Sequence, residues 1–293
     1  MDKPNLFIVG APKCGTTFLY HYLRKHPDIY FSDFKEPHFF GSDLIRKNKA
    51  YNLDASEYQK LFNSNKKIIG EASTFYIFSK NAAKEIYRFN PDAKIIIMLR
   101  NLVDLVHSMH SQFVFSGDET IEKFEEALNM ENQRLKGEKI PTQTTVVNKL
   151  FYTSNILALP KNINSFISCF KIENIKFILL DEIKNKPADT YLEVLKFLGV
   201  DLNVDIPDFK VINKNKIYKS KMIRNFIKQY ALFFGRIRQI IFNKPIGLFK
   251  LIEHLNTNQR KRLNLSQDLV NNLSEKFNKT SLNLEKLINK KIR

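Results

Sequence analysis

The stretch LFIVGAPKCGTTFLYHYLR, residues 6–24, decides the fold. Its first four residues are apolar and predict a buried β-strand, residues 10–15 predict a tight loop between two glycines, and residues 16–25 predict a helix that begins with two threonines. Unpaired backbone N–H groups and the positive end of a helix dipole meet where such a loop enters a helix. The stretch therefore predicts a site for phosphate or a chemically similar anion.

The loop differs in one place from the nucleotide-binding pattern G-x-x-x-x-G-K-S/T. Gly10 and Gly15 keep the spacing of that pattern, but Thr16 and Thr17 stand where it has lysine and a hydroxyl residue. The lysine lies inside the loop instead, at Lys13. The loop keeps a cation for an anionic ligand and places it differently, and an ordinary strand–helix turn rich in small residues is the alternative interpretation.

Composition indicates a soluble globular protein of one or two domains, since the chain has 293 residues, of which 43% are hydrophobic and 26% charged. Two cysteines, Cys14 and Cys169, cannot form a disulfide framework. The N-terminal residues lack the features of a secretion signal, and no window reaches the roughly 18 apolar residues of a spanning helix. These features predict a cytoplasmic protein.

The net charge of +17 is concentrated in the C-terminal third. Residues 210–293 carry 20 basic and 4 acidic residues, whereas residues 1–209 carry 27 basic and 26 acidic ones. Such a field suits an anionic donor, an acidic glycan, a membrane surface or nucleic acid. A lysine-rich composition with no specific ligand is the alternative interpretation.

Strand and helix patterns alternate along the first two thirds of the chain, with a kink expected at Pro160. The patterns predict strands at residues 67–70, 94–99 and 175–180 and helices at residues 56–62, 79–89, 101–115, 120–135, 153–169 and 188–198. This alternation implies an α/β fold with a P-loop-like central parallel sheet flanked by helices. We expect one domain over residues 1–293, with an α/β core at 1–205 and a mainly helical, basic extension at 206–293.

Ligands in such sheets bind beyond the carboxyl ends of the strands. Lys13, Glu71 and Arg100 each follow directly after a predicted strand. The sequence therefore predicts that these three side chains face one crevice.

The string PKCGTT resembles the 5′-phosphosulfate loop, P-K-x-G-T-T, of sulfotransferases that use 3′-phosphoadenosine 5′-phosphosulfate (PAPS). The resemblance implies that PAPS is the co-substrate. It also implies that the donor-binding residues of the loop are Pro12, Lys13, Cys14, Gly15, Thr16, Thr17 and Phe18.

A second motif of this family, R-N-P-x-D-x-x-x-S, holds the 3′-phosphate of the donor. RNLVDLVHSMHSQF, residues 100–113, is similar to it, with Arg100 and Ser108 at the family spacing and Leu102 where proline is usual. A guanidinium offers a planar fork of donors to a phosphate, and the serine adds a hydroxyl. The resemblance therefore implies that Arg100 and Ser108 bind the donor.

KEPHFF, residues 35–40, resembles the E-x-x-F-F segment of heparan sulfate sulfotransferases and their bacterial relatives. The resemblance implies that Glu36 is the catalytic base with His38 as its neighbour, and that the acceptor is a saccharide. GEASTFY, residues 70–76, is similar to the E-K-S/T-x-x-Y segment of the same enzymes, with Ala72 where they often carry lysine. Glu71 is a second candidate for acid–base work or acceptor orientation.

These motifs together imply in-line transfer of a sulfuryl group, with Glu36 taking a proton from the hydroxyl or amine of the acceptor. Lys13 and the hydroxyls of Thr16 and Thr17 stabilise charge on the bridging oxygen. No metal is expected. A nucleotide-dependent kinase is the alternative, because residues 175–183, IKFILLDEI, resemble a Walker B strand in which Asp181 holds Mg²⁺.

The basic C-terminal third holds less specific signals. NKNKIYKSK, residues 213–221, lies where relatives carry a basic segment over the 3′-phosphate, so Lys219 and Ser220 are candidate donor contacts. Residues 222–255 predict basic amphipathic helices that contact either an anionic membrane at the inner membrane surface or the core of the protein. No recognition signature for nucleic acid is present.

Overall fold

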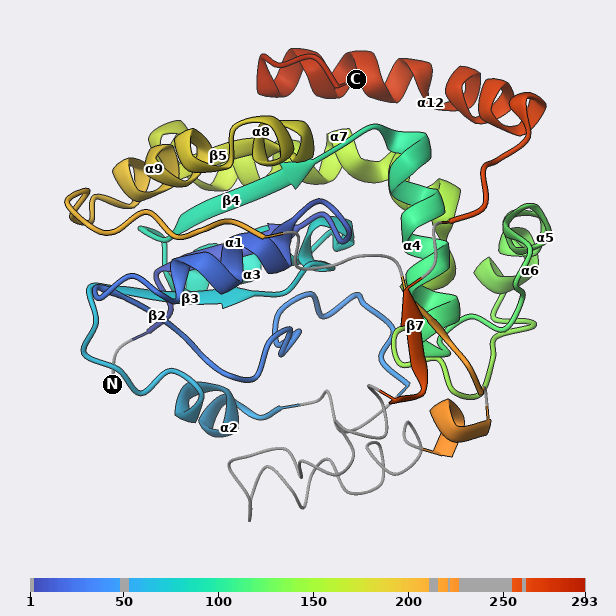
Figure 1. Cartoon of the computed structure of the whole chain (residues 1–293), viewed down its shortest axis with the longest axis horizontal. Helices are drawn as coiled ribbons and strands as arrows, with labels where there is room; N and C mark the ends of the chain where they lie inside the picture. The colour runs from blue at the N-terminus through green and yellow to red at the C-terminus, as the bar shows by residue number, and fades with distance from the viewer. Residues whose placement is uncertain are drawn as a thin grey trace.

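The computed structural model describes residues 3–47, 53–210, 216–220, 222–226, 255–259 and 262–292. Its centre is a parallel five-stranded sheet in the order β2-β3-β1-β4-β5 (Figure 1). The strands are β1 Leu6–Gly10, β2 Ile29–Phe31, β3 Ile68–Ala72, β4 Lys94–Leu99 and β5 Ile175–Leu179. The α/β fold predicted from the sequence is confirmed.

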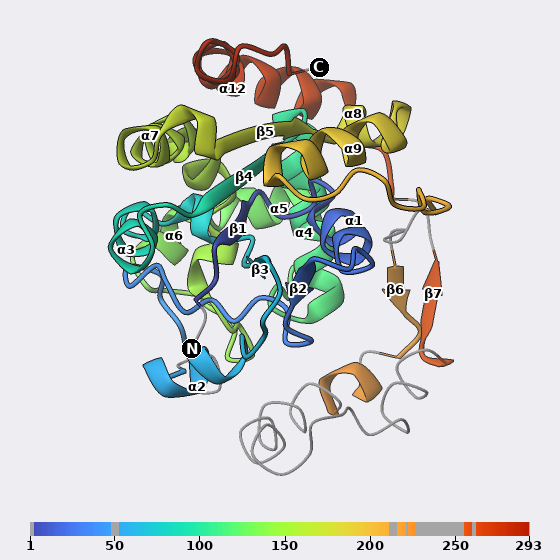
Figure 2. The ribbon, with the colours of Figure 1, turned by 90° about the vertical axis from the view of Figure 1, so that its left-hand side faces the viewer.

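Helices flank this sheet on both faces. Figure 2 shows α3 and α7 on one side of the strands and α1 on the other. The helices are α1 Thr16–Leu23, α2 Ala55–Lys60, α3 Ala82–Phe89, α4 Leu102–Ser116, α5 Phe124–Asn129, α6 Glu131–Leu135, α7 Tyr152–Cys169, α8 Leu180–Asn185, α9 Pro187–Leu198 and α12 Gln267–Ile288. Because both faces are covered, the central strands β1 and β4 are almost wholly apolar and buried.

The predicted elements are present, with local differences, one of which is the short helix α8 that was not predicted. Strand β2 has only three residues and pairs with β3, so it was too short to be recognised. The helix predicted over residues 120–135 is two helices, α5 and α6, that meet at Met130. Helix α3 begins later than predicted, because Ser79 is extended and its Oγ accepts a hydrogen bond from the backbone N–H of Ala82, 2.9 Å away.

The C-terminal third is not wholly helical. Strands β6 Lys216–Tyr218 and β7 Thr257–Gln259 form an antiparallel pair that packs on the end of α4, where Tyr218 stacks on Phe115 with ring centroids 4.3 Å apart. Helix α12 packs against α7 and α4.

Part of the basic amphipathic stretch predicted for residues 222–255 lies outside the described residues, as do Ile227, Tyr230, Phe233 and Phe234. Within the described ranges, no helix is both long enough and apolar enough to span a membrane. The division into a core at 1–205 and an extension at 206–293 stays a prediction.

Candidate active site

The loop between β1 and α1 depends on glycine at both of its ends. Gly10 has φ 140° and an added Cβ would lie 2.6 Å from the carbonyl oxygen of Thr74. Gly15 has φ 93° and is the N-cap of α1, with no side-chain hydrogen bond to the first turn. The chain therefore turns sharply into the helix, and the first-turn N–H groups receive no side-chain cap. This geometry suits a bound anion.

Lys13 and Arg100 lie together at the carboxyl ends of β1 and β4. Arg100 Nη1 donates to the carbonyl oxygen of Lys13 at 3.3 Å, and Arg100 Nη2 donates to Asp104 Oδ2 at 2.7 Å. Lys13 Nζ donates to Gln112 Oε1 at 2.9 Å. Arg100 Nε is buried and has no hydrogen-bond partner among the described residues. An unpaired guanidinium donor beside a lysine fits a phosphate or sulfate group.

A third cation, Arg262, reaches this place from the C-terminal third. Burial, together with the charges of Arg262 and Arg100, lowers the pKa of Lys13 to about 8. Burial and the charge of Arg100 lower the pKa of Arg262 in turn. Mutual repulsion among three partly buried cations indicates a site for a multiply charged anion.

Sequence reasoning missed Arg262. It placed the basic segment over the donor at Lys219 and Ser220, but the structure connects these residues to Asn256. The backbone N–H of Lys219 donates to the Asn256 carbonyl at 2.8 Å, and that of Ser220 to Asn256 Oδ1 at 2.8 Å. Donor contacts for Lys219 and Ser220 stay a prediction. The basic string RKR at residues 260–262, just before α12, was the signal that could have identified Arg262.

Several loop side chains point into the core. Cys14 is fully buried, which raises the pKa of its thiol to about 12, and Thr16 and Pro12 are also buried. Their side chains are therefore turned away from solvent, and the donor contacts expected of Pro12, Cys14 and Thr16 stay predictions. Thr17 is half-buried and opens the helix beside them.

Two further candidates take part in helix packing. Phe18 contacts Tyr22 and Phe209, with ring centroids 4.7 and 5.4 Å away. Ser108 lies inside α4, as the motif spacing requires, and is 3% exposed. The donor contacts expected of both residues stay predictions.

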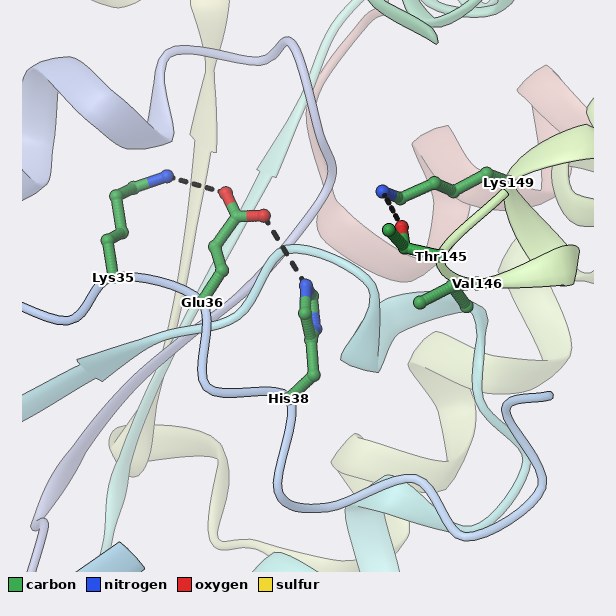
Figure 3. Close-up of a pocket in the computed structure, with 6 residues that line it drawn as sticks. All are labelled: Lys35, Glu36, His38, Thr145, Val146 and Lys149. Carbon is green, nitrogen blue, oxygen red and sulfur yellow. Dashed lines mark hydrogen bonds and ion pairs between the residues drawn. The ribbon is translucent and has the colours of Figure 1, made fainter. Parts of the chain in front are cut away.

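A pocket of about 280 Å³ has two walls that are far apart in the sequence (Figure 3). Its lining residues are Lys35, Glu36 and His38 on one wall and Thr145, Val146 and Lys149 on the other. The Glu36 carboxylate lies between two nitrogens, Lys35 Nζ at 2.6 Å and His38 Nε2 at 3.4 Å. The two residues predicted as base and neighbour are therefore in contact at the edge of a cavity.

The charges around Glu36 keep it ionised. Burial opposes ionisation, but the ammonium of Lys35 and the hydrogen bond with His38 outweigh it and hold the pKa of Glu36 well below its usual range. Burial lowers the pKa of His38 more than Glu36 raises it, so this imidazole is neutral near pH 7. Lys149, across the pocket, also lowers the pKa of His38. An ionised carboxylate, held by Lys35 and His38, therefore lines the cavity.

Glu71 lies at the end of β3 but does not line the pocket. It is 2% exposed, and its Oε2 accepts hydrogen bonds from the hydroxyls of Tyr58 and Tyr76 at 3.0 and 2.9 Å. Burial raises the pKa of Glu71 to about 7 despite these hydrogen bonds. Of the three residues expected to face one crevice, Lys13 and Arg100 are in contact, and Glu71 is enclosed by tyrosines. Its catalytic role stays a prediction that these contacts do not favour.

The feature behind the kinase alternative lies away from the pocket. Asp181 lies two residues beyond the end of β5, in the first turn of α8, where it pairs with Lys184 at the surface. His107 and His110 pack on Phe124. In the part of the chain that the structure describes, no three side chains of His, Cys, Asp or Glu gather as metal ligands would.

A family model for the sulfotransferase domain matches residues 3–234, well over half of the chain. The chain belongs to the sulfotransferase family. This confirms the family that the PKCGTT loop and the Arg100–Ser108 motif indicated, and the kinase interpretation is not favoured.

The curated relatives of this sulfotransferase include carbohydrate enzymes. Carbohydrate sulfotransferase 15 of Mus musculus is 33% identical over 43% of this chain and 31% of that protein. Membrane-associated sulfotransferase kil1 of Dictyostelium discoideum is 39% identical over 39% of this chain and 23% of that protein. The bifunctional heparan sulfate N-deacetylase/N-sulfotransferase 1 of Caenorhabditis briggsae is 23% identical over 70% of this chain and 23% of that protein. These matches span less than a third of each relative.

Solved sulfotransferases share the fold. The sulfotransferase from Alicyclobacillus acidocaldarius has a TM-score of 0.63 and 30% identity, covering 85% of this chain and 100% of that one. Mouse sulfotransferase SULT7A1 complexed with PAP has a TM-score of 0.50 over 96% of this chain and 86% of that one, at 15% identity, which shows the fold alone.

Proposed function

We propose that this sulfotransferase moves a sulfuryl group from PAPS to a hydroxyl or amine of a saccharide, with Glu36 as the base. One observation carries the proposal: the Glu36 carboxylate is close enough to Lys13 to raise the pKa of that lysine, against the effects of burial and of Arg262. The base pocket and the anion loop therefore adjoin. A group held by the loop and an acceptor held in the pocket would meet between these two residues.

The loop and its cations fit the phosphosulfate and 3′-phosphate of such a donor. When bound, the donor supplies the sulfuryl group. Arg100, with its unpaired Nε, and Arg262 supply positive charge for the phosphates. Lys13, held by Gln112, stabilises the charge that grows on the leaving phosphate.

Glu36 accepts the proton of the acceptor. Because Lys35 and His38 keep its pKa low, Glu36 is a weak base in the free enzyme. Proton transfer to it becomes favourable once the acceptor oxygen or nitrogen has begun to bond to sulfur, since this bond acidifies the acceptor. His38 and Lys35 hold the carboxylate in place for this late step.

The saccharide acceptor is supported by relatives whose names specify carbohydrate and heparan sulfate sulfotransfer. The test is a screen of glycan acceptors with radiolabelled PAPS. We expect label in at least one saccharide, and transfer only to phenols or steroids would contradict the proposal. Calorimetry provides a second arm, in which 3′-phosphoadenosine 5′-phosphate (PAP) should bind far more tightly than ATP with Mg²⁺.

We further propose that the protein is cytoplasmic and contacts an anionic membrane through its basic amphipathic stretch, residues 222–255. Met222, Phe226 and Leu255 are 83%, 64% and 61% exposed, and residues 210–250 carry eleven basic and no acidic residues. Flotation with vesicles of phosphatidylserine and phosphatidylcholine tests this contact. Binding at low salt that disappears without phosphatidylserine is expected, and no binding at low salt would exclude it.

A further inference from the structure

The segment that carries the base has an unusual backbone. Glu36 has φ 62° and His38 has φ 48°, which is the left-handed region that residues with a Cβ seldom adopt. Two such residues so close together persist only where neighbouring groups hold the chain. Neighbouring groups therefore hold residues 35–41, the base loop, in place.

The N–H groups of the base loop bind to the segment that follows β3. The backbone N–H of Glu36 donates to the Ala72 carbonyl at 3.1 Å, and that of His38 to Ser73 Oγ at 2.9 Å. The N–H of Phe40 donates to the hydroxyl of Tyr76 at 3.2 Å. Every second residue of the base loop is thus tied to the carboxyl end of the central sheet.

The Tyr76 hydroxyl is itself oriented by Glu71. It accepts the hydrogen bond from Phe40 and donates its own proton to Glu71 Oε2 at 2.9 Å, and both side chains are almost fully buried. Tyr58 donates to the same carboxylate oxygen at 3.0 Å but has no hydrogen bond to the base loop. Tyr76 and Tyr58 thus share one acceptor, and of the two hydroxyls only that of Tyr76 is also hydrogen-bonded to the base loop.

The carbonyl groups of the base loop bind to Arg46. Its Nη2 donates to the carbonyl of His38 at 2.6 Å and also to that of Phe40. Among the described residues no salt bridge involves Arg46, so its guanidinium is directed to backbone oxygens. Burial lowers the pKa of this arginine.

Arg46 also joins the two walls of the pocket. Its backbone forms an antiparallel bridge with Val146, which lines the wall opposite Glu36. The neighbouring N–H of Lys47 donates to the Thr145 carbonyl at 2.9 Å. One residue therefore fixes the base loop through its side chain and the facing wall through its backbone.

We propose that Arg46 and Tyr76 are positioning residues that hold Glu36 at the reacting atoms, Tyr76 through the N–H side of the base loop and Arg46 through its carbonyl side. This inference rests on the proposed function, because it takes Glu36 as the base. Neither residue touches the substrate. Each acts through the conformation of the base loop.

The test compares Tyr76→Phe and Arg46→Met with the control Tyr58→Phe, which removes the other hydroxyl from Glu71 and leaves the base loop untouched. We expect Tyr76→Phe and Arg46→Met to lower kcat about 10- to 100-fold, because misplacing a reacting group by about 1 Å costs this much. The KM of the acceptor should change less than kcat, and PAP should bind within about twofold of wild type. Tyr58→Phe should keep kcat within about twofold.

A second readout reports the base loop without turnover. The ¹⁵N resonances of the His38 ring, assigned with His38→Asn, should shift in Tyr76→Phe and Arg46→Met because the contact with Glu36 changes, and should stay in place in Tyr58→Phe. If Arg46→Met does not fold, Arg46→Lys replaces it and should restore part of kcat and of the His38 spectrum, since an ammonium can still donate to the carbonyls.

Two results would overturn the inference. One is that the His38 resonances are unchanged in both positioning variants, and the other is that both of these variants have a kcat within twofold of that of Tyr58→Phe. A different result would contradict the proposed function: a wild-type enzyme that sulfates no saccharide. In that case the His38 spectra still decide whether Arg46 and Tyr76 hold the base loop.

Discussion

The donor side and the base side of this sulfotransferase are built in opposite ways. The donor side is one continuous stretch that consists of a strand, a loop bounded by Gly10 and Gly15, and a helix. Arg100 joins it from the end of the neighbouring strand β4. The base side joins segments around residues 36, 46, 73, 76 and 146 through side-chain to backbone hydrogen bonds and one backbone bridge. A local motif thus makes the proposed anion site, whereas long-range contacts position the proposed base.

The largest expected effect separates the two sides at Glu36. Glu36→Gln should lower kcat by about 10²- to 10⁴-fold, because the amide cannot accept the proton. PAP affinity should remain within about twofold, since the donor side is intact. Steady-state kinetics and calorimetry measure both quantities. Turnover at the wild-type rate would move the base to another residue, and a parallel loss of PAP affinity would show that the two sides are not separable.

A change at Lys13 should affect both sides. Lys13→Met should lower kcat by about 10²- to 10³-fold, the usual cost of removing one group that stabilises transition-state charge. Because the pKa of Lys13 in the free protein is about 8, its charge is present below pH 8 and is lost above it. PAP affinity should therefore fall by up to about tenfold between pH 7 and 9. Calorimetry across this range with Lys13→Arg as control, in which the fall should be absent, checks the assignment.

On the base side, the burial of Glu71 should make the stability of the protein depend on pH. The folded-state pKa of Glu71 is about 7, above its ordinary value of 4.5. Below pH 4.5 Glu71 is protonated in both the folded and the unfolded state, so its ionisation does not affect stability. As the pH rises from 4.5 to 7, the free energy of unfolding falls by up to about 3 kcal/mol, at about 1.4 kcal/mol per pKa unit. Glu71→Gln, which keeps an oxygen for the two tyrosines, should be more stable than wild type at pH 8 and similar at pH 5. Urea unfolding at both pH values measures the difference, and an equal difference at both would refute the assignment.

The smallest expected effect decides which C-terminal residue belongs to the donor side. Arg262→Ala should weaken PAP binding about tenfold, or about 1.4 kcal/mol, because one cation near Lys13 is removed. Lys219→Ala should change the affinity by less than about twofold, since an exposed charge is largely screened. Calorimetry at two salt concentrations compares them. The reverse order would return the donor contact to Lys219.

Much of the fold was predictable because the burial of whole strands leaves a strong pattern. The runs at residues 6–9 and 94–99 are buried on both faces of a parallel sheet, so nearly every residue is apolar. Strand β2 escaped prediction because three residues carry no periodicity. The β6–β7 pair also escaped, since its two strands are about forty residues apart in the sequence and only tertiary packing on α4 brings them together.

The candidate site divides in the same way. Sequence by itself determined the anion loop, because glycine spacing, a loop lysine and a helix start produce N–H groups and charge through local geometry. It also determined that Glu36, His38 and Arg100 belong to motifs. Only the tertiary structure showed that Glu71 is enclosed by tyrosines and that the charge of Arg262 lowers the pKa of Lys13. Only the tertiary structure, again, made Arg46 the link between the pocket walls. Burial, charge–charge repulsion and hydrogen bonds between distant segments depend on three-dimensional proximity, which no local spacing encodes.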